Sequence, residues 1–382
     1  MKSVGSRIAN TLLVVGSILM TYAVIEFLVF PQIFPHLPEK YYHYGTRDTR
    51  RLIQSSVNGT VPSGEYIAML GDSYAAGAGD WFNRQGWDLM TEYHSANIIH
   101  RRMDKDVFVF GVPGAGSVDG ACVNPIHSVR YIRNAGFSLS APETVLYYFY
   151  EGNDLVDNTT FINKYYRPEN ANPCDDRQLG TFLEEFIAEK ASGVPDTYGD
   201  RLLFANMLYR MAYYKPWKNV PQFDDTQDTG TNRVLINDQE TPVATPLFSS
   251  AFALTDAQHR DALCLLKGAL RQSHAFFSES RYVVVYLPSP PVCYETESPL
   301  RVVWEGDEMT ADPAELNRRS DALAAQVAAI AGELGLEFLD ARPAMRQAAL
   351  RNVIHGPTDW THYNEIGYTA LGDFVADFLQ TK

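Results

Sequence analysis

Basic residues are scarce in this sequence of 382 residues, in which 32 Lys and Arg stand against 46 Asp and Glu and give a formal net charge of −14. A protein that binds nucleic acid needs a basic surface to neutralise phosphates, so the sequence argues against a nucleic-acid partner. Cysteine is also scarce, and none of the four cysteines stands in a CxxC spacing, which argues against a zinc site. Internal repeats and low-complexity tracts are absent. With 46% hydrophobic residues, the chain can form a full folded core.

A long apolar segment near the N-terminus predicts a membrane anchor. Residues 8–30 carry a single charged side chain, Glu26, and as a helix they are long enough to cross about 30 Å of hydrocarbon. Lys2 and Arg7 precede the segment. The positive-inside rule therefore places the N-terminus in the cytoplasm and the chain after about residue 31 on the periplasmic or extracellular side.

A cleaved signal peptide is the alternative to this anchor. The apolar segment is long for a signal peptide, and no small-x-small cleavage site follows it. We therefore predict an uncleaved signal anchor over residues 1–35 and a stalk or linker over residues 36–65. For Glu26 we expect a carboxylate that reaches the outer membrane surface, and the alternative is a contact with a membrane partner.

The cysteines Cys122, Cys174, Cys264 and Cys293 are even in number, and outside the cytoplasm they can form disulfides. Four cysteines permit three pairings, and the sequence does not choose between them. Cys264 lies in the apolar helical run "DALCLLKGAL", which is also compatible with a buried thiol.

Apolar strands alternate with helical segments from residue 66 onward. The predicted strands are residues 66–70, 106–111, 143–150, 281–288 and 336–340, and the clearest helices are residues 87–103 and 312–335. Continuous apolar runs are typical of parallel strands that are buried on both faces. The alternation predicts one α/β domain over residues 66–382, with three layers and a mainly parallel sheet.

The segment at about residues 158–250 interrupts this alternation. It contains two predicted helices, residues 181–191 and 200–214, and then a polar, turn-rich stretch. We interpret it as a helical and irregular insertion or cap that borders the substrate site. The alternative is a surface excursion without a catalytic role.

Ser73 follows the first strand in the sequence "YIAMLGDSYAAGAGDW". This position places its hydroxyl at the carboxyl edge of a strand, where α/β sheets present ligand sites. If a helical turn begins there, the Ser73 N–H is one of the unpaired first-turn donors. A hydroxyl beside a free amide can act as nucleophile and oxyanion donor together, although a serine at a helix start is more often only a cap.

Two further segments supply candidate oxyanion donors. The loop "FGVPGAGS" follows the second strand and contains Gly114, whose N–H can approach a bound oxygen without a side chain in the way. Its glycines do not match the GxGxxG pattern of dinucleotide-binding proteins. Asn153 follows the third strand in "YFYEGNDL", and its side-chain amide can donate to an oxyanion. A plain turn and an Asx-turn are the ordinary alternatives.

Asp359 and His362 stand three residues apart in "PTDWTHYNEIGY" near the C-terminus. On one helical or 3₁₀ turn they face the same way, so the carboxylate can orient the imidazole and stabilise its charged form. His355 is the rival for the imidazole. We expect Asp72 and Asp154 to form hydrogen bonds within their loops.

In this order, the four segments resemble the SGNH, or GDSL-type, serine hydrolase family. The resemblance rests on Gly71-Asp72-Ser73, Gly114, Gly152-Asn153-Asp154 and Asp359-x-x-His362. It implies a three-layer α/β/α, flavodoxin-like fold, with Ser73 as nucleophile, His362 as general base and Asp359 as the residue that orients it. It also implies an oxyanion hole formed by the N–H groups of Ser73 and Gly114 and the side-chain amide of Asn153.

These inferences together predict a membrane-anchored serine esterase or acyltransferase outside the cytoplasm. Ser73 would attack an ester carbonyl, and water or a second alcohol would release the acyl group; this chemistry requires no metal or organic cofactor. The tethered site favours acyl esters, above all O-acetyl esters, on cell-envelope carbohydrate. The alternatives are a lipid esterase or lysophospholipase and a noncatalytic glycan-binding scaffold of a polysaccharide export system.

Overall fold

The structure is a computed structural model. It describes residues 4–33, 57–58, 61–62, 64–80, 93–134, 138–166, 172–192, 202–213, 230–304 and 307–381. The predicted stalk therefore lies almost wholly outside the described residues, and so do residues 87–92 of the first predicted helix.

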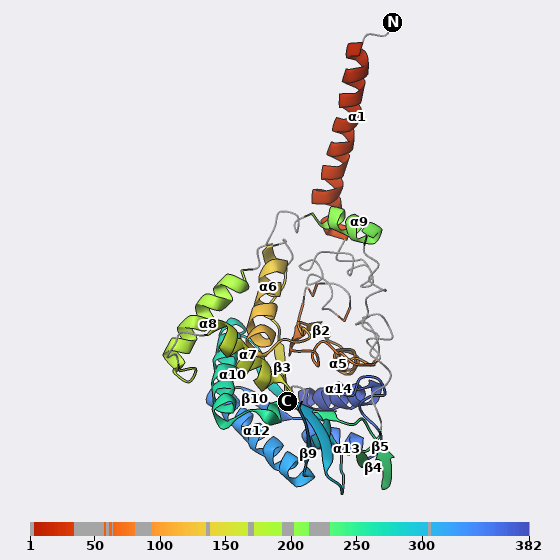
Figure 1. The fold of residues 1–382 in the computed structure, drawn as a ribbon. Coiled ribbons are helices and arrows are strands. Elements are labelled where there is room, and N and C mark those ends of the chain that lie inside the picture. The colour runs from red at the N-terminus through yellow and green to blue at the C-terminus, as the bar shows by residue number, and fades with distance from the viewer. Residues whose placement is uncertain are drawn as a thin grey trace.

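A five-stranded parallel sheet forms the centre of the fold (Figure 1). Its strands in chain order are β1 (Tyr66–Gly71), β2 (Asp106–Val109), β3 (Thr144–Tyr150), β7 (Arg281–Leu287) and β10 (Glu337–Asp340). They lie side by side in the order β10-β7-β3-β1-β2, and every pairing among them is parallel. Numbered within the sheet, this is the flavodoxin-like order 2-1-3-4-5. All five predicted strands are present, with ends that differ by one or two residues.

Helices cover both faces of the sheet, as the alternating side chains of β1 show. Tyr66, Ala68 and Leu70 belong to one buried cluster, whereas Ile67 and Met69 belong to the other. The first cluster includes residues of η4 (Asp119–Val123), α6 (Asn124–Asn134), α7 (Asp154–Tyr165), α8 (Asp176–Lys190), α10 (Asp256–Phe276) and α12 (Pro313–Glu333). The second includes residues of α5 (Ser95–Met103), α11 (Pro290–Cys293), α13 (Arg342–Ala349) and α14 (Glu365–Gln380). The three-layer α/β/α prediction is confirmed.

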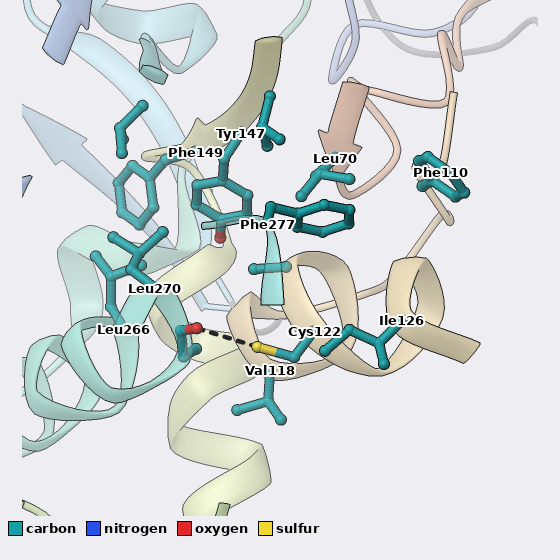
Figure 2. Packing of buried hydrophobic residues seen from close by; sticks show 14 of the residues in the cluster. Leu70, Phe110, Val118, Cys122, Ile126, Tyr147, Phe149, Leu266, Leu270 and Phe277 are labelled. Atoms are coloured by element: carbon teal, nitrogen blue, oxygen red, sulfur yellow. Dashed lines mark hydrogen bonds between the residues drawn. The ribbon is translucent and has the colours of Figure 1, made fainter. Parts of the chain in front are cut away.

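Figure 2 shows part of the first cluster, where side chains from the sheet pack over the segment from η4 to α6. Cys122 lies fully buried there, and its thiol donates to the Ala269 carbonyl oxygen at 3.0 Å. Cys122 and Cys293 are the two free cysteines, and both are buried.

The helix boundaries follow local capping signals. Asp312 and Pro313 begin α12 as predicted, because the Asp312 side chain accepts from the Ala314 N–H at 2.7 Å. The prediction for residues 87–103 is wrong at residues 93 and 94, because α5 begins only at Ser95. There the His94 Nδ1 accepts from the Ala96 N–H at 2.9 Å and caps the helix.

The segment predicted as an insertion contains α8 and α9 (Leu203–Tyr213), the two helices expected there. Its polar part forms a hairpin of β4 (Arg233–Ile236) and β5 (Gln239–Pro242) around the left-handed residues Asn237 and Asp238. Three further strands form a small sheet: β6 (Leu247–Phe248), β8 (Leu300–Trp304) and β9 (Asp307–Ala311). A 3₁₀ turn, η7 (Ser250–Ala253), then leads into α10.

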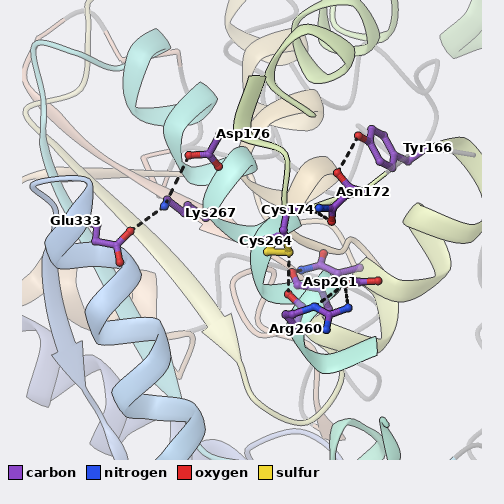
Figure 3. The surroundings of a disulfide bond; sticks show 11 residues. Tyr166, Asn172, Cys174, Asp176, Arg260, Asp261, Cys264, Lys267 and Glu333 are labelled. Atoms are coloured by element: carbon purple, nitrogen blue, oxygen red, sulfur yellow. Dashed lines mark hydrogen bonds and ion pairs between the residues drawn. A yellow bond between two sulfur atoms is a disulfide. The ribbon is translucent and has the colours of Figure 1, made fainter. Parts of the chain in front are cut away.

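A disulfide joins Cys174, just before α8, to Cys264 in α10 (Figure 3). The alternative that Cys264 is a buried thiol is therefore wrong. One turn further along α10, the Lys267 ammonium lies 2.8 Å from the Glu333 carboxylate of α12 and 3.8 Å from Asp176 of α8. The disulfide and the Lys267–Asp176 pair hold α8 against α10, and the Lys267–Glu333 pair joins α10 to α12.

The N-terminal helix runs without interruption from α1 (Val4–Val24) through a π-helical turn, η1 (Ile25–Val29), into α2 (Phe30–Ile33). Residues 8–33 are long and apolar enough to span a membrane, and a signal sequence would pass the same test. That Glu26 lies at the outer membrane surface stays a prediction, but its carboxylate is not open to solvent. Its side chain is 1% exposed, because α9 packs over it.

Candidate active site

Ser73 lies in a tight turn at the carboxyl end of β1, between β2 and β3 in the sheet. The turn requires Gly71, which has a φ of +138°, and a Cβ there would lie 2.7 Å from the Tyr148 carbonyl oxygen. The Asp72 carbonyl then accepts from the Ala76 N–H at 3.0 Å and the Ser73 carbonyl from the Ala78 N–H at 2.8 Å, so the chain turns as it leaves the strand. The Asp72 carboxylate accepts from the Tyr74 N–H at 2.8 Å and fixes the same turn. The Ser73 side chain is thereby held at the sheet edge.

Ser73, His362 and Asp359 form a chain of two hydrogen bonds. The Nε2 atom of His362 lies 2.8 Å from the Ser73 Oγ, and the Nδ1 atom lies 2.7 Å from the Asp359 Oδ2. The Asp359 side chain is almost fully buried, so its carboxylate is screened little by water. This geometry can pass the serine proton to the imidazole, while the carboxylate holds the ring in one tautomer.

The loop that carries Asp359 and His362 is not the helical turn that the sequence predicts. The Asp359 Oδ1 instead accepts from the backbone N–H groups of Thr361, at 3.0 Å, and His362, at 3.1 Å. The side chain thus closes an Asx-type turn, and α14 begins only at Glu365. One carboxylate oxygen shapes the loop and the other contacts the imidazole.

The charges around His362 favour its protonated form. Burial lowers the pKa of His362, but the Asp359 charge and hydrogen bond outweigh burial and raise this pKa above its usual value, with smaller contributions from Asp72 and Asp80. Burial likewise opposes the Asp359 carboxylate, yet the His362 charge and the surrounding hydrogen bonds lower the pKa of Asp359. An imidazole that is more basic than usual is suited to accept a proton from Ser73.

His355, the rival imidazole, lies in a different environment. The Tyr294 hydroxyl accepts from the backbone N–H groups of Ile354 and His355, so it donates to the His355 Nδ1 at 2.9 Å. Burial is the main cause that lowers the pKa of His355 to about 3. His355 is therefore a neutral core histidine, and none of its contacts within the described part of the chain reaches Ser73.

Asp80 is a residue of the site that the sequence analysis did not single out. Its carboxylate is 3% exposed and accepts from the Thr358 N–H at 3.1 Å, the Thr358 hydroxyl and the Asp359 N–H at 2.5 Å. It thus ties the segment after Ser73 to the loop of Asp359 and His362. No spacing signal in the sequence reveals this contact, because the partners are 278 and 279 residues apart.

Two tyrosines also join the segment after Ser73 to the C-terminal part of the chain. The Tyr74 hydroxyl donates to the Thr361 carbonyl at 2.5 Å, and its ring centroid lies 5.2 Å from that of His362. The Tyr368 hydroxyl, from α14, donates to the Ala78 carbonyl at 2.7 Å. The imidazole is therefore positioned by contacts on both sides of the loop.

The candidate oxyanion donors lie at the ends of the strands beside β1. The loop with Gly114 follows β2, and its Val112 N–H donates to the Gly71 carbonyl at 3.2 Å. Asn153 follows β3 and stands just before α7. The N–H groups of Ser73 and Gly114 donate to no other described residue, and the Asn153 Oδ1 is buried without a described partner. The strand order reverses between β1 and β3, and open α/β sheets bind ligands at the carboxyl edge of such a switch point.

Asp72 and Asp154, the other acidic residues of the motifs, accept backbone hydrogen bonds within their loops. The Asp154 carboxylate accepts from the Tyr150 N–H at 3.1 Å, so it holds the segment that carries Asn153 against the end of β3. Burial raises the pKa of Asp72 to about 6.

Within the described ranges, no three His, Cys, Asp or Glu side chains lie close enough together to hold a metal ion.

No protein-family model matches the sequence, and no curated protein matches it. Similar solved structures include an extracellular lipase from Streptomyces rimosus, which is 12% identical over 82% of this chain and 99% of that chain, with a TM-score of 0.40. A phospholipase A1 from Streptomyces albidoflavus is 12% identical over 84% of this chain and all of that chain, with a TM-score of 0.36. An acetyl xylan esterase from Butyrivibrio proteoclasticus is 10% identical over 84% of this chain and 65% of that chain, with a TM-score of 0.35. At such identities and TM-scores, these likenesses do not decide the reaction of this chain.

Proposed function

We propose that the protein is a serine-dependent ester hydrolase or acyltransferase. The observation that carries the proposal is the pair of hydrogen bonds from Ser73 to His362, at 2.8 Å, and from His362 to Asp359, at 2.7 Å. The SGNH-type motifs and the placement of Ser73 at the switch point of the sheet support it. The helical and irregular segment at about residues 158–250 borders the substrate site in this proposal.

In the proposed reaction, the His362 Nε2 takes the Ser73 proton while the serine oxygen bonds to the ester carbonyl carbon. The N–H groups of Ser73 and Gly114 and the Asn153 amide donate to the resulting oxyanion. When the tetrahedral centre collapses, the C–O bond to the leaving alcohol breaks, and His362 returns the proton to that alcohol. Water, or a second alcohol in a transferase, then attacks the acyl-serine while His362 takes its proton. The bond between the Ser73 Oγ and the acyl carbon breaks as this second tetrahedral centre collapses, and His362 returns the proton to Ser73.

The proposed location is a cytoplasmic or inner membrane, with the catalytic domain on its outer face. The apolar helix of residues 8–33 and the basic residues before it support a single span with the N-terminus inside. The disulfide between Cys174 and Cys264 supports an oxidising compartment for the domain. An extracytoplasmic tether brings the site within reach of cell-envelope carbohydrate, so we propose O-acetyl groups on such carbohydrate as the substrate.

A panel of esters tests the proposal with the full chain in detergent. We expect hydrolysis of p-nitrophenyl acetate and release of acetate from acetylated oligosaccharides, and Ser73→Ala should abolish both. Ser298→Ala, at an exposed loop position, is the matched control and should retain full activity. Preference for long-chain lipid esters would replace the carbohydrate proposal, and acetate moved to an added oligosaccharide rather than released would identify a transferase. Full turnover by Ser73→Ala would refute the serine mechanism.

A further inference from the structure

The buried carboxylate of Glu26 connects the N-terminal helix to α9. The Glu26 oxygens accept from the Phe204 N–H at 2.8 Å, the Ala205 N–H at 3.0 Å and the Tyr22 hydroxyl at 2.8 Å. Phe204 and Ala205 are in the first turn of α9, whose N–H groups have no partner within their own helix. A carboxylate at this end also interacts favourably with the helix dipole. Glu26 therefore caps α9 from a different helix.

Apolar contacts hold the two helices together beside this cap. Phe30 is 6% exposed, and its ring centroid lies 5.0 Å from that of Phe204. Leu203 and Met207 of α9 are half-buried against the same cluster, to which Ile25 of the N-terminal helix also belongs. In Figure 1, α9 lies across the C-terminal end of the long helix instead of continuing its direction. The polar and aromatic contacts together fix this crossing.

The apolar face of α9 continues beyond the part that the N-terminal helix covers. Leu208 follows Phe204 by four residues and Met211 follows Met207 by four, so each pair lies on one face of α9. Yet Leu208 is 50% exposed and Met211 is 48% exposed, and Tyr209 beside them is 64% exposed. Large apolar side chains also stay exposed on the adjoining η1, where Phe27 is 57% and Leu28 is 67% exposed.

We propose that α9 lies in the plane of the membrane surface, with the exposed side chains of Leu208 and Met211 in the lipid. Glu26 holds α9 against the N-terminal helix. The inference rests on the proposed anchor. Lipid is the expected occupant because the exposed apolar face of α9 adjoins the exposed apolar surface of the proposed span. Amphipathic helices lie in the headgroup region, where tyrosine is also enriched, and Tyr209 is exposed on α9. The protein then contacts the membrane through two elements, and this sets the height of the catalytic domain above the lipid.

Fluorescence quenching tests the position of α9 with the full chain in phosphatidylcholine–phosphatidylglycerol vesicles. Leu208→Cys is labelled with an environment-sensitive nitrobenzoxadiazole dye, and Arg318→Cys, on the exposed face of α12, is the matched control. The native cysteines do not compete, because two are buried and two form the disulfide. We expect lipids with a nitroxide high on the acyl chain to quench most of the emission at position 208 and little at position 318. Equal, weak quenching at both positions would overturn the inference.

Hydrogen exchange in the same vesicles tests whether Glu26 holds the first turn of α9. Glu26→Ala should speed exchange of the amides in the first turn of α9 at least several-fold, whereas Glu26→Gln, which keeps one acceptor oxygen, should have a smaller effect. Unchanged exchange in Glu26→Ala would show that Glu26 does not hold α9.

The outcomes separate this inference from the proposals on which it rests. If alkaline carbonate washes the protein from the vesicles, the anchor fails and the inference fails with it. If the protein stays bound but position 208 is not quenched, only the inference fails. Ester hydrolysis that depends on Ser73 is measured independently of both results.

Discussion

Replacing Asp80 by asparagine tests whether this carboxylate positions the catalytic loop. Asp80 accepts hydrogen bonds from the Thr358 N–H, the Thr358 hydroxyl and the Asp359 N–H. A hydrogen bond to a charged group contributes about 1.5–3 kcal/mol, and asparagine keeps only one of the two acceptor oxygens. We therefore expect Asp80→Asn to weaken the interaction that holds the loop of Asp359 and His362 by about 2 kcal/mol. If this loss falls fully on the transition state, kcat/KM decreases about 30-fold.

The pH profile separates positioning from a general loss of stability. Burial lowers the pKa of His362, the Asp359 charge raises it most, and the Asp80 charge adds to the rise. The base must be neutral to accept a proton, so kcat/KM falls as the pH drops through this pKa. Removing the Asp80 charge lowers the pKa of His362, and the acid limb of kcat/KM should therefore move to lower pH in Asp80→Asn.

Asp377→Asn is the matched control for this shift. It removes the same formal charge from an exposed site on α14, where Asp377 pairs with Arg102. Its profile should coincide with that of the parent protein, because exposed charges are screened by salt. An acid limb that stays in place or moves to higher pH in Asp80→Asn, measured with p-nitrophenyl acetate, would refute the role assigned to Asp80.

Three further results are expected. Replacing Cys174 and Cys264 together by alanine removes a cross-link between residues 90 apart, and chain entropy predicts a loss of up to about 4–5 kcal/mol in the free energy of unfolding by urea; an unchanged midpoint would contradict this. Asp359→Asn should lower kcat by about 10³–10⁴ with KM little changed, because the imidazole loses the group that sets its tautomer; an activity near that of the parent would remove Asp359 from the site. Gly71→Ala should destabilise the fold and lower the activity, since its Cβ would meet the Tyr148 carbonyl at 2.7 Å, and thermal unfolding at the parent temperature would contradict that strain.

The sheet was predictable from the sequence because its inner strands β1, β3 and β7 are buried on both faces. Such strands appear as continuous apolar runs, as in "YIAML" and "RYVVVYL", and the pattern is local enough to locate each strand within one or two residues. That Ser73, Gly114 and Asn153 follow strand ends at the same edge of the sheet follows from topology, because the carboxyl ends of parallel strands lie together. The Asx-type turn at Asp359 could not be separated from a helical turn, since both suit an acidic residue before a helix.

The contacts that the sequence could not reveal join distant segments without a periodic signal. Asp80 stands in "GAGDW", where nothing distinguishes a buried carboxylate from an ordinary loop residue. The pairing of Cys174 with Cys264 was one of three possible arrangements. Glu26 was interpreted from its own helix alone, and its partners in α9 are 178 and 179 residues further along the chain. Each of these contacts depends on tertiary packing, which a single sequence does not display.

Covalent labelling of the full chain with a fluorophosphonate measures the proposed nucleophile most directly. The account predicts one adduct per chain, located by peptide mass spectrometry on Ser73, which is lost in Ser73→Ala and strongly slowed in His362→Ala. An adduct on a different serine, or labelling of Ser73→Ala at the parent rate, would contradict the account.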